Sequence, residues 1–161
     1  MAKTADDTNR KPKNGRAHEV VLRGGMARTI GVRLMSVSKK RVVAEMPVGP
    51  KHLNRSLRVN GGALMAFADV LGATGTVANL PPGYRTTTLE SKTNFFAAGE
   101  GPVLKAVSKP LHIGRTTMVW QTTIRNTDRR LVAIVTQTQM VLPAERVPGV
   151  SGPRSGVGRK R

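Results

Sequence analysis

The chain has 161 residues, with 27 Lys and Arg against 9 Asp and Glu, a net charge of +18 and no cysteine. This length supports one domain with a hydrophobic core. The absence of cysteine excludes disulfides, thiolate metal sites and a cysteine nucleophile. No apolar run approaches the roughly 20 residues that span a bilayer, and residues 1–16 lack the apolar segment of a secretory signal. We therefore expect a cytoplasmic protein without a membrane span.

The positive charge is compatible with an anionic partner, either nucleic acid or a smaller anionic ligand. Only five aromatic residues are present, and no basic helix or stacking strip is visible, so the sequence gives little support to nucleic-acid recognition. Residues 1–18 and 144–161 are poor in apolar residues, and we expect them to be disordered basic tails around a single domain at residues 19–143.

Two strands are predicted near the start of the domain. Residues 27–36 alternate Ile30, Val32 and Leu34 with polar or small residues, which is typical of a half-buried strand. Residues 41–48 form the second strand, and the short turn between the two makes them a hairpin.

The polar loop that follows, residues 51–59, contains two residues that could contribute to a site. His52 could be catalytic, although a single histidine in a loop is more often solvated. Asn54 could orient a ligand, and the more common role of such an asparagine is to form a turn.

A long helix with almost no charge is predicted over residues 60–79, and the rest of the chain is organised around it. Its apolar residues recur at helical spacing: Leu64, Phe67, Val70, Leu71 and Val77. Asn60 is a suitable N-cap, and Pro81 follows the end of the pattern. Gly72 and Gly75 each weaken a helix by roughly 1 kcal/mol relative to Ala, so packing against another element must stabilise it.

Asp69 is the only charged residue in this helix. Its neighbours three and four positions away are Met65, Ala66, Gly72 and Ala73, and none of them can donate a side-chain hydrogen bond. An unpaired carboxylate on an apolar helix is costly to bury. Either a basic residue from elsewhere pairs with Asp69, or the helix face is solvated, or the carboxylate belongs to a functional site.

Four strands are predicted after the helix. The closely linked strands imply antiparallel pairing, and one helix against such a sheet predicts an α+β fold. The predicted strands are residues 84–96, 103–113, 116–126 and 131–142.

The sequence contains no phosphate-binding loop, zinc motif or serine-nucleophile motif, and three scattered histidines do not make a metal cluster. We expect neither a metal nor a cofactor. The chemistry that remains is a carboxylate, Asp69, together with the backbone of Gly61 and Gly62, where helix N-terminal amides can bind developing negative charge or the glycines can simply pack closely. Gly61 and Asp69 lie eight positions apart, about 12 Å along a helix. One carbonyl cannot easily contact both, so a real site would combine Gly61 of one chain with Asp69 of another.

Four segments in this order resemble the hotdog-fold acyl-CoA thioesterases of the phenylacetate-pathway and 4-hydroxybenzoyl-CoA thioesterase type. They are Asn54 through Asp69, Ser-Lys-Thr-Asn-Phe-Phe at 91–96, His-Ile-Gly-Arg-Thr at 112–116 and Leu-Val-Ala at 131–133. The resemblance covers roughly residues 27–142. It implies a long central helix wrapped by an antiparallel sheet of about five to six strands, and a homodimer or homotetramer with the active site at the subunit interface.

The resemblance also implies a role for each candidate residue. Asp69 would be the nucleophile or general base, and the Gly61 amide, next to Gly62, would polarise the thioester carbonyl of an acyl-CoA substrate. Asn54 would help to shape the site, and Gly114 and Arg115 would lie towards the CoA phosphates.

One position departs from the family pattern: the usual histidine before the two glycines is Asn60 here. Asparagine can cap the helix and lie at the substrate, but it cannot transfer protons as histidine does. The sequence therefore predicts an acyl-CoA thioesterase. Its alternatives are a hotdog hydratase or dehydratase, which would typically pair the acid with a histidine, and a non-catalytic acyl-CoA-binding hotdog protein.

Overall fold

The computed structural model of the protein describes residues 20–21 and 25–144. The predicted tail at residues 1–18, and all but Ala144 of the tail predicted at residues 144–161, lie outside the described residues. The tails and the domain bounds of residues 19–143 therefore stay predictions.

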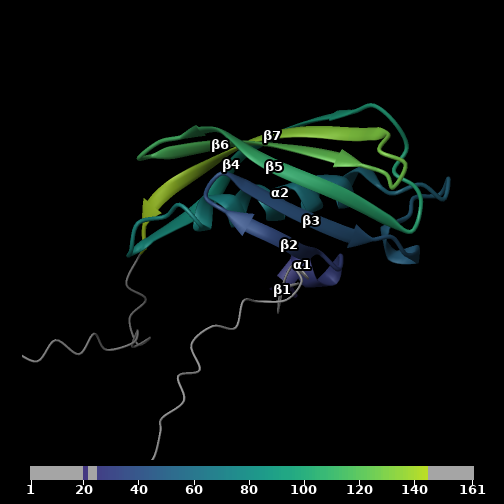
Figure 1. Cartoon of the computed structure of the whole chain (residues 1–161), viewed down its shortest axis with the longest axis horizontal. Helices are drawn as coiled ribbons and strands as arrows, with labels where there is room; N and C mark the ends of the chain where they lie inside the picture. Colours follow the sequence, from purple (N-terminus) through teal and green to yellow (C-terminus); the bar gives the residue numbers. More distant parts are fainter. Residues whose placement is uncertain (1–19, 22–24, 145–161) are drawn as a thin grey trace, which may run out of the picture.

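Within the described residues, seven strands form a single antiparallel sheet in the order β1-β2-β3-β5-β6-β7-β4 (Figure 1). Five of them agree with the predicted strands, β2 overlaps only the end of its predicted range, and β1 is an additional strand of two residues. The bounds are β1 Val20–Val21, β2 Arg33–Ser38, β3 Arg41–Pro47, β4 Tyr84–Phe95, β5 Val103–Ile113, β6 Thr117–Arg125 and β7 Leu131–Pro143.

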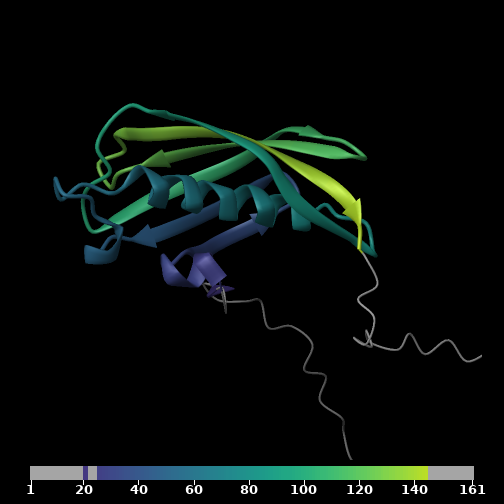
Figure 2. The same ribbon diagram turned by 180° about the vertical axis from the view of Figure 1, so that it is seen from behind.

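One long helix, α2 at Gly61–Val77, lies against one face of this sheet and runs along its strands (Figure 2). Asn60 is its N-cap, as predicted, because the Asn60 Oδ1 accepts a hydrogen bond of 2.7 Å from the Gly62 N–H. The only other helices in the described part of the chain are the short α1 at Gly25–Thr29 and the 3₁₀ turn η1 at Pro50–His52. A sheet wrapped around one long helix confirms the predicted α+β hotdog architecture.

The strand predicted over residues 27–36 is wrong in its first half. Residues up to Thr29 belong to α1, and β2 begins only at Arg33. Ile30 and Val32 are both buried, but they lie in the connection around Gly31, which has a φ of +72°. A turn can therefore place alternate residues in the core without forming a strand.

The inward face of the sheet is divided into two parts. The larger core cluster covers α2 with apolar side chains, chiefly from β3, β5 and the first half of β7, among which Val42, Ala44, Met46 and Leu104 are fully buried. Farther along β7, the inward positions are instead polar, and the large side chains of Gln137 and Gln139 are buried there. This polar part lies beneath the second half of α2.

Two glycines of α2 allow large side chains of the sheet to approach the helix backbone. A Cβ atom on Gly75 would lie 2.5 Å from Cη2 of the fully buried Trp120, and a Cβ on Gly72 would overlap the amide group of Gln137. These glycines weaken the helix, but they create notches that the sheet fills.

We predict that Gly75→Ala destabilises the fold. The methyl group would press on a rigid ring that cannot move into solvent, and overpacking of this kind costs about 1–3 kcal/mol, only partly offset by the higher helix propensity of Ala. Gly72→Ala is the matched control, because its methyl group meets only the flexible end of Gln137. Thermal denaturation should give the lower Tm for Gly75→Ala, and the opposite order would contradict this packing argument.

Candidate active site

Asp69 lies on the side of α2 that faces the edge strand β4, and it is half-buried. Its Oδ1 accepts a hydrogen bond of 2.7 Å from the Thr88 hydroxyl and one of 3.3 Å from Gln137 Nε2, which lies equally close to the Asp69 backbone oxygen. No described cation forms an ion pair with Asp69. The carboxylate is thus held by neutral donors, and the described residues do not provide the basic partner considered from the sequence.

The hydrogen bonds around Asp69 continue along the sheet. Gln139 Nε2 donates to the Thr88 hydroxyl at 2.8 Å, and the Thr86 hydroxyl donates to Gln139 Oε1 at 3.0 Å. Thr88, Gln137 and Gln139 were not predicted as site residues. The sequence did contain a signal for two of them, because Gln137 and Gln139 occupy alternate positions of β7 between the buried Val135 and Val141.

The start of α2 gathers a second group of predicted residues. Gly61, Asn54, Phe95 and Gly99 line a cleft of about 370 Å³ together with their neighbours. A Cβ on Gly61 would lie 3.1 Å from the ring of Phe95. The Gly62 N–H is already bonded to Asn60, whereas no described residue accepts a hydrogen bond from the Gly61 N–H.

Asn54 has a local structural role in this loop. Its Oδ1 accepts hydrogen bonds from the backbone N–H groups of Ser56 at 2.9 Å and Arg58 at 3.1 Å. These bonds stabilise the turn in which Leu57 has a φ of +57°. Asn54 therefore forms the turn that the sequence suggested, and it also lines the cleft.

Gly114 and Arg115 lie in the turn between β5 and β6, away from the start of α2. A Cβ on Gly114 would overlap the His112 ring, and the Gly114 N–H donates to the Thr117 backbone oxygen at 2.9 Å. Phe95, which lies beside Gly61, is in the same cross-strand row as Ala106 of β5. Ala106 is seven residues before Ile113, which corresponds to about 23 Å along the strand. One chain therefore does not bring the start of α2 and this turn together.

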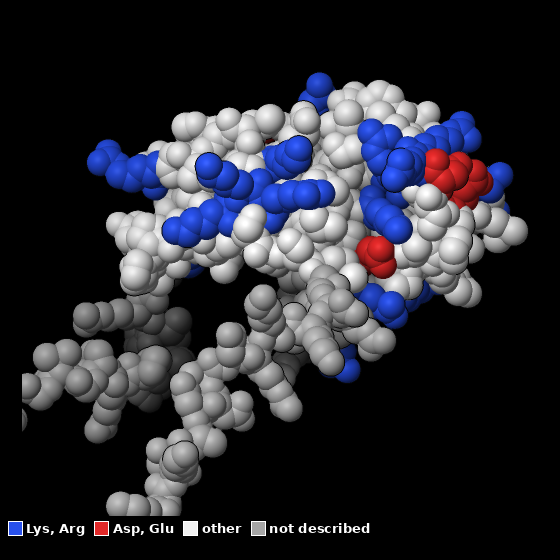
Figure 3. Space-filling model, in the orientation of Figure 1, with Lys and Arg blue, Asp and Glu red and all other residues white. Residues whose placement is uncertain are grey.

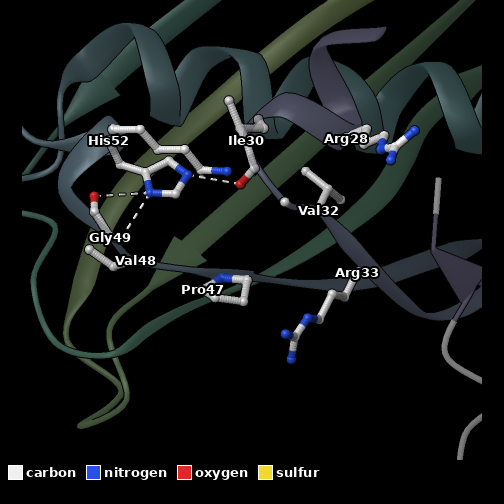
Figure 4. A pocket seen from close by; sticks show the side chains of 10 residues that line it. Arg28, Ile30, Val32, Arg33, Pro47, Val48, Gly49 and His52 are labelled. Atoms are coloured by element: carbon white, nitrogen blue, oxygen red, sulfur yellow. Dashed lines mark hydrogen bonds between the residues drawn. The ribbon is translucent and has the colours of Figure 1, made fainter. Parts of the chain in front are cut away.

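His52 is buried, in contrast to the solvated loop histidine that its context suggested (Figure 4). Its Nε2 donates to the Ile30 backbone oxygen at 2.8 Å. Its Nδ1 lies 3.0 Å from the Gly49 backbone nitrogen and 3.2 Å from the Gly49 backbone oxygen. Both nitrogens are used within the chain, so His52 fastens the loop before α2 to the segment before β2.

Lys and Arg gather on the sheet face opposite α2 (Figure 3). They line an open groove of about 600 Å³ over β3, β5, β6 and the β6–β7 turn, with no aromatic side chain among its lining residues. The cations of this groove are Arg41, Lys105, Lys109, Arg125 and Arg129. Within the described part of the chain, the one acidic side chain in ion-pair contact with this group is Glu45, 3.7 Å from Lys105. Base stacking, which would favour nucleic acid, has no support here.

The described residues contain no group of three or more His, Cys, Asp or Glu residues that could hold a metal ion. None of their helices is long and apolar enough to cross a membrane.

Comparison with known proteins agrees with the hotdog architecture. A family model described as the thioesterase superfamily matches residues 58–133. A putative esterase of Deinococcus radiodurans is 30% identical over 115 residues, which cover 70% of this chain and 71% of that protein. The 1,4-dihydroxy-2-naphthoyl-CoA hydrolase of Listeria monocytogenes is 26% identical over 110 residues, which cover 68% of this chain and 89% of that protein.

A solved structure gives the same result in three dimensions. The hypothetical thioesterase protein with coenzyme A from Streptococcus pneumoniae has a TM-score of 0.65 and 26% sequence identity, over 72% of this chain and 89% of that one. The chain belongs to the thioesterase superfamily, and it is a thioester hydrolase.

We predict that His52→Leu lowers stability without impairing the chemistry. The substitution leaves the Ile30 carbonyl and the Gly49 N–H without their partner, and a buried unsatisfied polar group costs about 1–3 kcal/mol. The Tm should fall, while kcat per folded protein should stay at the wild-type value, measured at a temperature where both proteins are folded. A large loss of kcat in the folded variant would instead give His52 a role in catalysis.

Proposed function

We propose that this protein hydrolyses acyl-CoA thioesters to the free acid and CoA, with Asp69 as the nucleophile or general base. The observation that carries the proposal is the position of Asp69. It is the only charged residue of α2, it is half-buried at the sheet edge, and its contacts are neutral hydrogen-bond donors. A carboxylate that is ordered but not paired with a cation remains available for chemistry.

Hydrolysis requires an oxygen to attack the thioester carbon and the C–S bond to break. As a general base, Asp69 would take a proton from water while the water oxygen attacks, and the CoA thiolate would leave and take up a proton. As a nucleophile, the Asp69 oxygen would displace the thiolate and form a mixed anhydride, which water would then hydrolyse. Both routes use the same carboxylate.

The developing negative charge on the carbonyl oxygen needs a hydrogen-bond donor. We assign this role to the Gly61 N–H, which opens α2 and has no acceptor among the described residues. Amides in this position point towards an anion, and the helix dipole adds to the attraction. Asn54, Asn60 and Gly62 would shape the surrounding cleft.

Two chains are needed to complete this site in our proposal. Gly61 and Asp69 are separated by two turns of α2, about 12 Å, so the Gly61 N–H and Asp69 that serve one carbonyl would belong to different protomers. Strand β4 supports a homodimer, alone or as half of a tetramer. It lies at the edge of the sheet, paired only with β7 among the described strands, and Leu89 and Phe95 of this strand are exposed.

The substrate class is inferred from two of the similar proteins. The Listeria relative is a hydrolase of a CoA thioester by its name, and the Streptococcus structure is described with coenzyme A. A hydratase or dehydratase is less well supported, because neither described histidine, His52 or His112, forms a hydrogen bond with Asp69. A screen over short, medium, long and aromatic acyl-CoAs would test the substrate class. A cytoplasmic location, where such substrates occur, belongs to the same proposal.

The central prediction concerns Asp69→Asn, which keeps the shape of the side chain but removes its charge and its basicity. We expect a folded protein that still binds acyl-CoA, with kcat reduced by roughly a hundredfold or more, the scale of a lost general base. Steady-state hydrolysis and a binding assay with a non-hydrolysable CoA thioether would separate the two effects. Wild-type turnover by Asp69→Asn would refute the proposed mechanism.

The two-chain arrangement has a test of its own. A mixed dimer of one Asp69→Asn protomer and one protomer disabled at Gly61, for example by Gly61→Pro, should retain one intact site of the two. We expect about half of the wild-type kcat per dimer, whereas both parent homodimers should be nearly inactive. An inactive mixed dimer formed from folded protomers would contradict the proposed geometry.

Arg115 is the proposed contact for the CoA phosphates, and it is exposed in the β5–β6 turn. Phosphate contacts are alike in the ground state and the transition state, so Arg115→Ala should raise KM and change kcat less. Because salt screens an exposed charge, the effect should be largest at low ionic strength. Arg130→Ala, which removes an exposed arginine from the β6–β7 turn, is the control. An unchanged KM for Arg115→Ala at low salt would remove Arg115 from the site.

A further inference from the structure

We propose that Gln139, Thr88 and Gln137 are positioning residues that fix the direction of the Asp69 carboxylate. This inference rests on the proposed function, because it assigns these residues to the reaction of Asp69. They come from two strands, β4 and β7, and both hydrogen bonds that they make to the carboxylate end on the same oxygen, Oδ1.

The Thr88 hydroxyl has one proton, and its direction is set by the groups around it. Gln139 Nε2 can only donate, and it donates to this hydroxyl at 2.8 Å. The hydroxyl oxygen therefore acts as the acceptor towards Gln139, and its own proton is directed to Asp69 Oδ1 at 2.7 Å. A short chain of bonds thus turns Thr88 into a dedicated donor for the carboxylate.

The amide of Gln139 has one orientation that serves the carboxylate. Gln139 is only 1% exposed, and its Oε1 lies 3.0 Å from the Thr86 hydroxyl, whose single proton can also be donated to the Met140 backbone oxygen at 2.9 Å. A reversed amide would place Oε1 against Thr88, where it would compete with Asp69 Oδ1 for the one hydroxyl proton of Thr88. The order Gln139, Thr88, Asp69 is therefore the one in which the carboxylate keeps this donor.

Gln137 provides the second donor through the notch at Gly72. Its amide occupies the space that a Cβ at position 72 would fill, and its Nε2 lies 3.3 Å from both the backbone oxygen and Oδ1 of Asp69. Since both of these atoms are acceptors, the Nε2 must face them. This orientation leaves Gln137 Oε1 buried without a hydrogen-bond partner.

A β-bulge lies at the same point of β4. The register between β4 and β7 shifts between Thr88 and Glu90, so the more buried side chains change from even positions, such as Thr86, to odd positions, such as Ser91 and Thr93. Bulges commonly redirect a side chain beside a functional site. In β4, Thr88 is the last even-numbered residue before this shift, and its side chain reaches Asp69.

The consequence is an asymmetric carboxylate. Oδ1 receives two donors, whereas Oδ2 receives no hydrogen bond from the described residues. Oδ1 fixes the plane of the group, and Oδ2 is left to take a proton from water or to attack the thioester carbon. Misplacement of a reacting group by about 1 Å can cost 10²-fold in rate. Loss of the hydrogen bonds that orient the Asp69 carboxylate should therefore lower kcat.

The test uses Thr88→Val, which keeps the shape and removes the hydroxyl, and Thr88→Ser, which restores it. We expect Thr88→Val to lower kcat by about tenfold or more, the scale of a hydrogen bond to a charged group, with KM for the acyl-CoA changed by less than about twofold. Thr88→Ser should recover most of kcat. A Thr88→Val protein with wild-type kcat would overturn the inference.

Thr138→Val is the matched control. Thr138 also donates its hydroxyl proton to a carboxylate across β4 and β7, to Glu90 Oε1 at 2.9 Å, but it lies on the other face of the sheet, because Gln137 and Gln139 occupy the alternate positions on the buried face. It should leave kcat unchanged. An equal fall of kcat in both variants would mean that a general weakening of the β4–β7 pair causes the effect, and it would overturn the positioning role.

Two further variants test the chain of bonds itself. Gln139→Leu should lower kcat in the wild-type background but have little additional effect in Thr88→Val, because Gln139 acts only through Thr88. Gly72→Ala should lower kcat by displacing the Gln137 amide while the protein remains folded, as judged by its Tm. Additive effects of Gln139→Leu and Thr88→Val would contradict the relay, as would wild-type kcat in Gly72→Ala.

These outcomes are separable from failure of the proposed function. If Asp69→Asn keeps wild-type turnover, the proposed mechanism fails whatever the positioning variants do. If Asp69→Asn is inactive and Thr88→Val is fully active, the mechanism stands and the positioning inference fails.

Discussion

The packing of α2 against the sheet is the interaction on which the rest of the structure depends. This helix contains four glycines and a single charge, so its own helix propensity is poor, and most of the stability of such a helix must come from burial. Leu64, Phe67 and Leu71 supply that burial on one side. Farther along the buried side of the helix, Gly72 and Gly75 admit Gln137 and Trp120 of the sheet. Stability and site geometry therefore come from one interface.

The division of this interface explains why a carboxylate can be placed on an apolar helix. The cluster under the first half of α2 is apolar, whereas the strands beneath Asp69 present amides and hydroxyls. Desolvation of a carboxylate is offset only where such donors reach it. The hydroxyl of Thr88 and the amide of Gln137 thus make position 69 one at which an acid is tolerated on this helix.

Much of this fold could be predicted from local patterns in the sequence. Strand alternation, the capping asparagine at position 60 and the breaks at Pro81 and Gly114 are properties of short segments, and the structure confirms them. The error at α1 arose because Ile30 and Val32 reach the core from a turn, where burial alternates for a different reason.

The surroundings of Asp69 could not be predicted in the same way. Thr88 and Gln137 lie 19 and 68 residues from Asp69 in the sequence, and their contacts depend on the register of β4 with β7. A bulge in that pair changes which residues face the helix, and a single sequence gives no reliable sign of its position. The acid itself could be identified, because its charge is unusual in the helix, whereas its partners are ordinary strand residues.

The exposed edge of β4 gives the large positive charge a physical consequence. A separate protomer presents a strand of 12 residues with an unpaired edge, and Leu89, Phe95 and the adjacent Phe96 are all more than half exposed. Such edges pair readily with other chains and promote aggregation. A net charge of +18 makes protomers repel one another at distances up to about a Debye length, roughly 10 Å at 0.1 M salt. Colloidal stability of the newly synthesised chain should therefore decline as salt rises, even though the strand itself is unchanged.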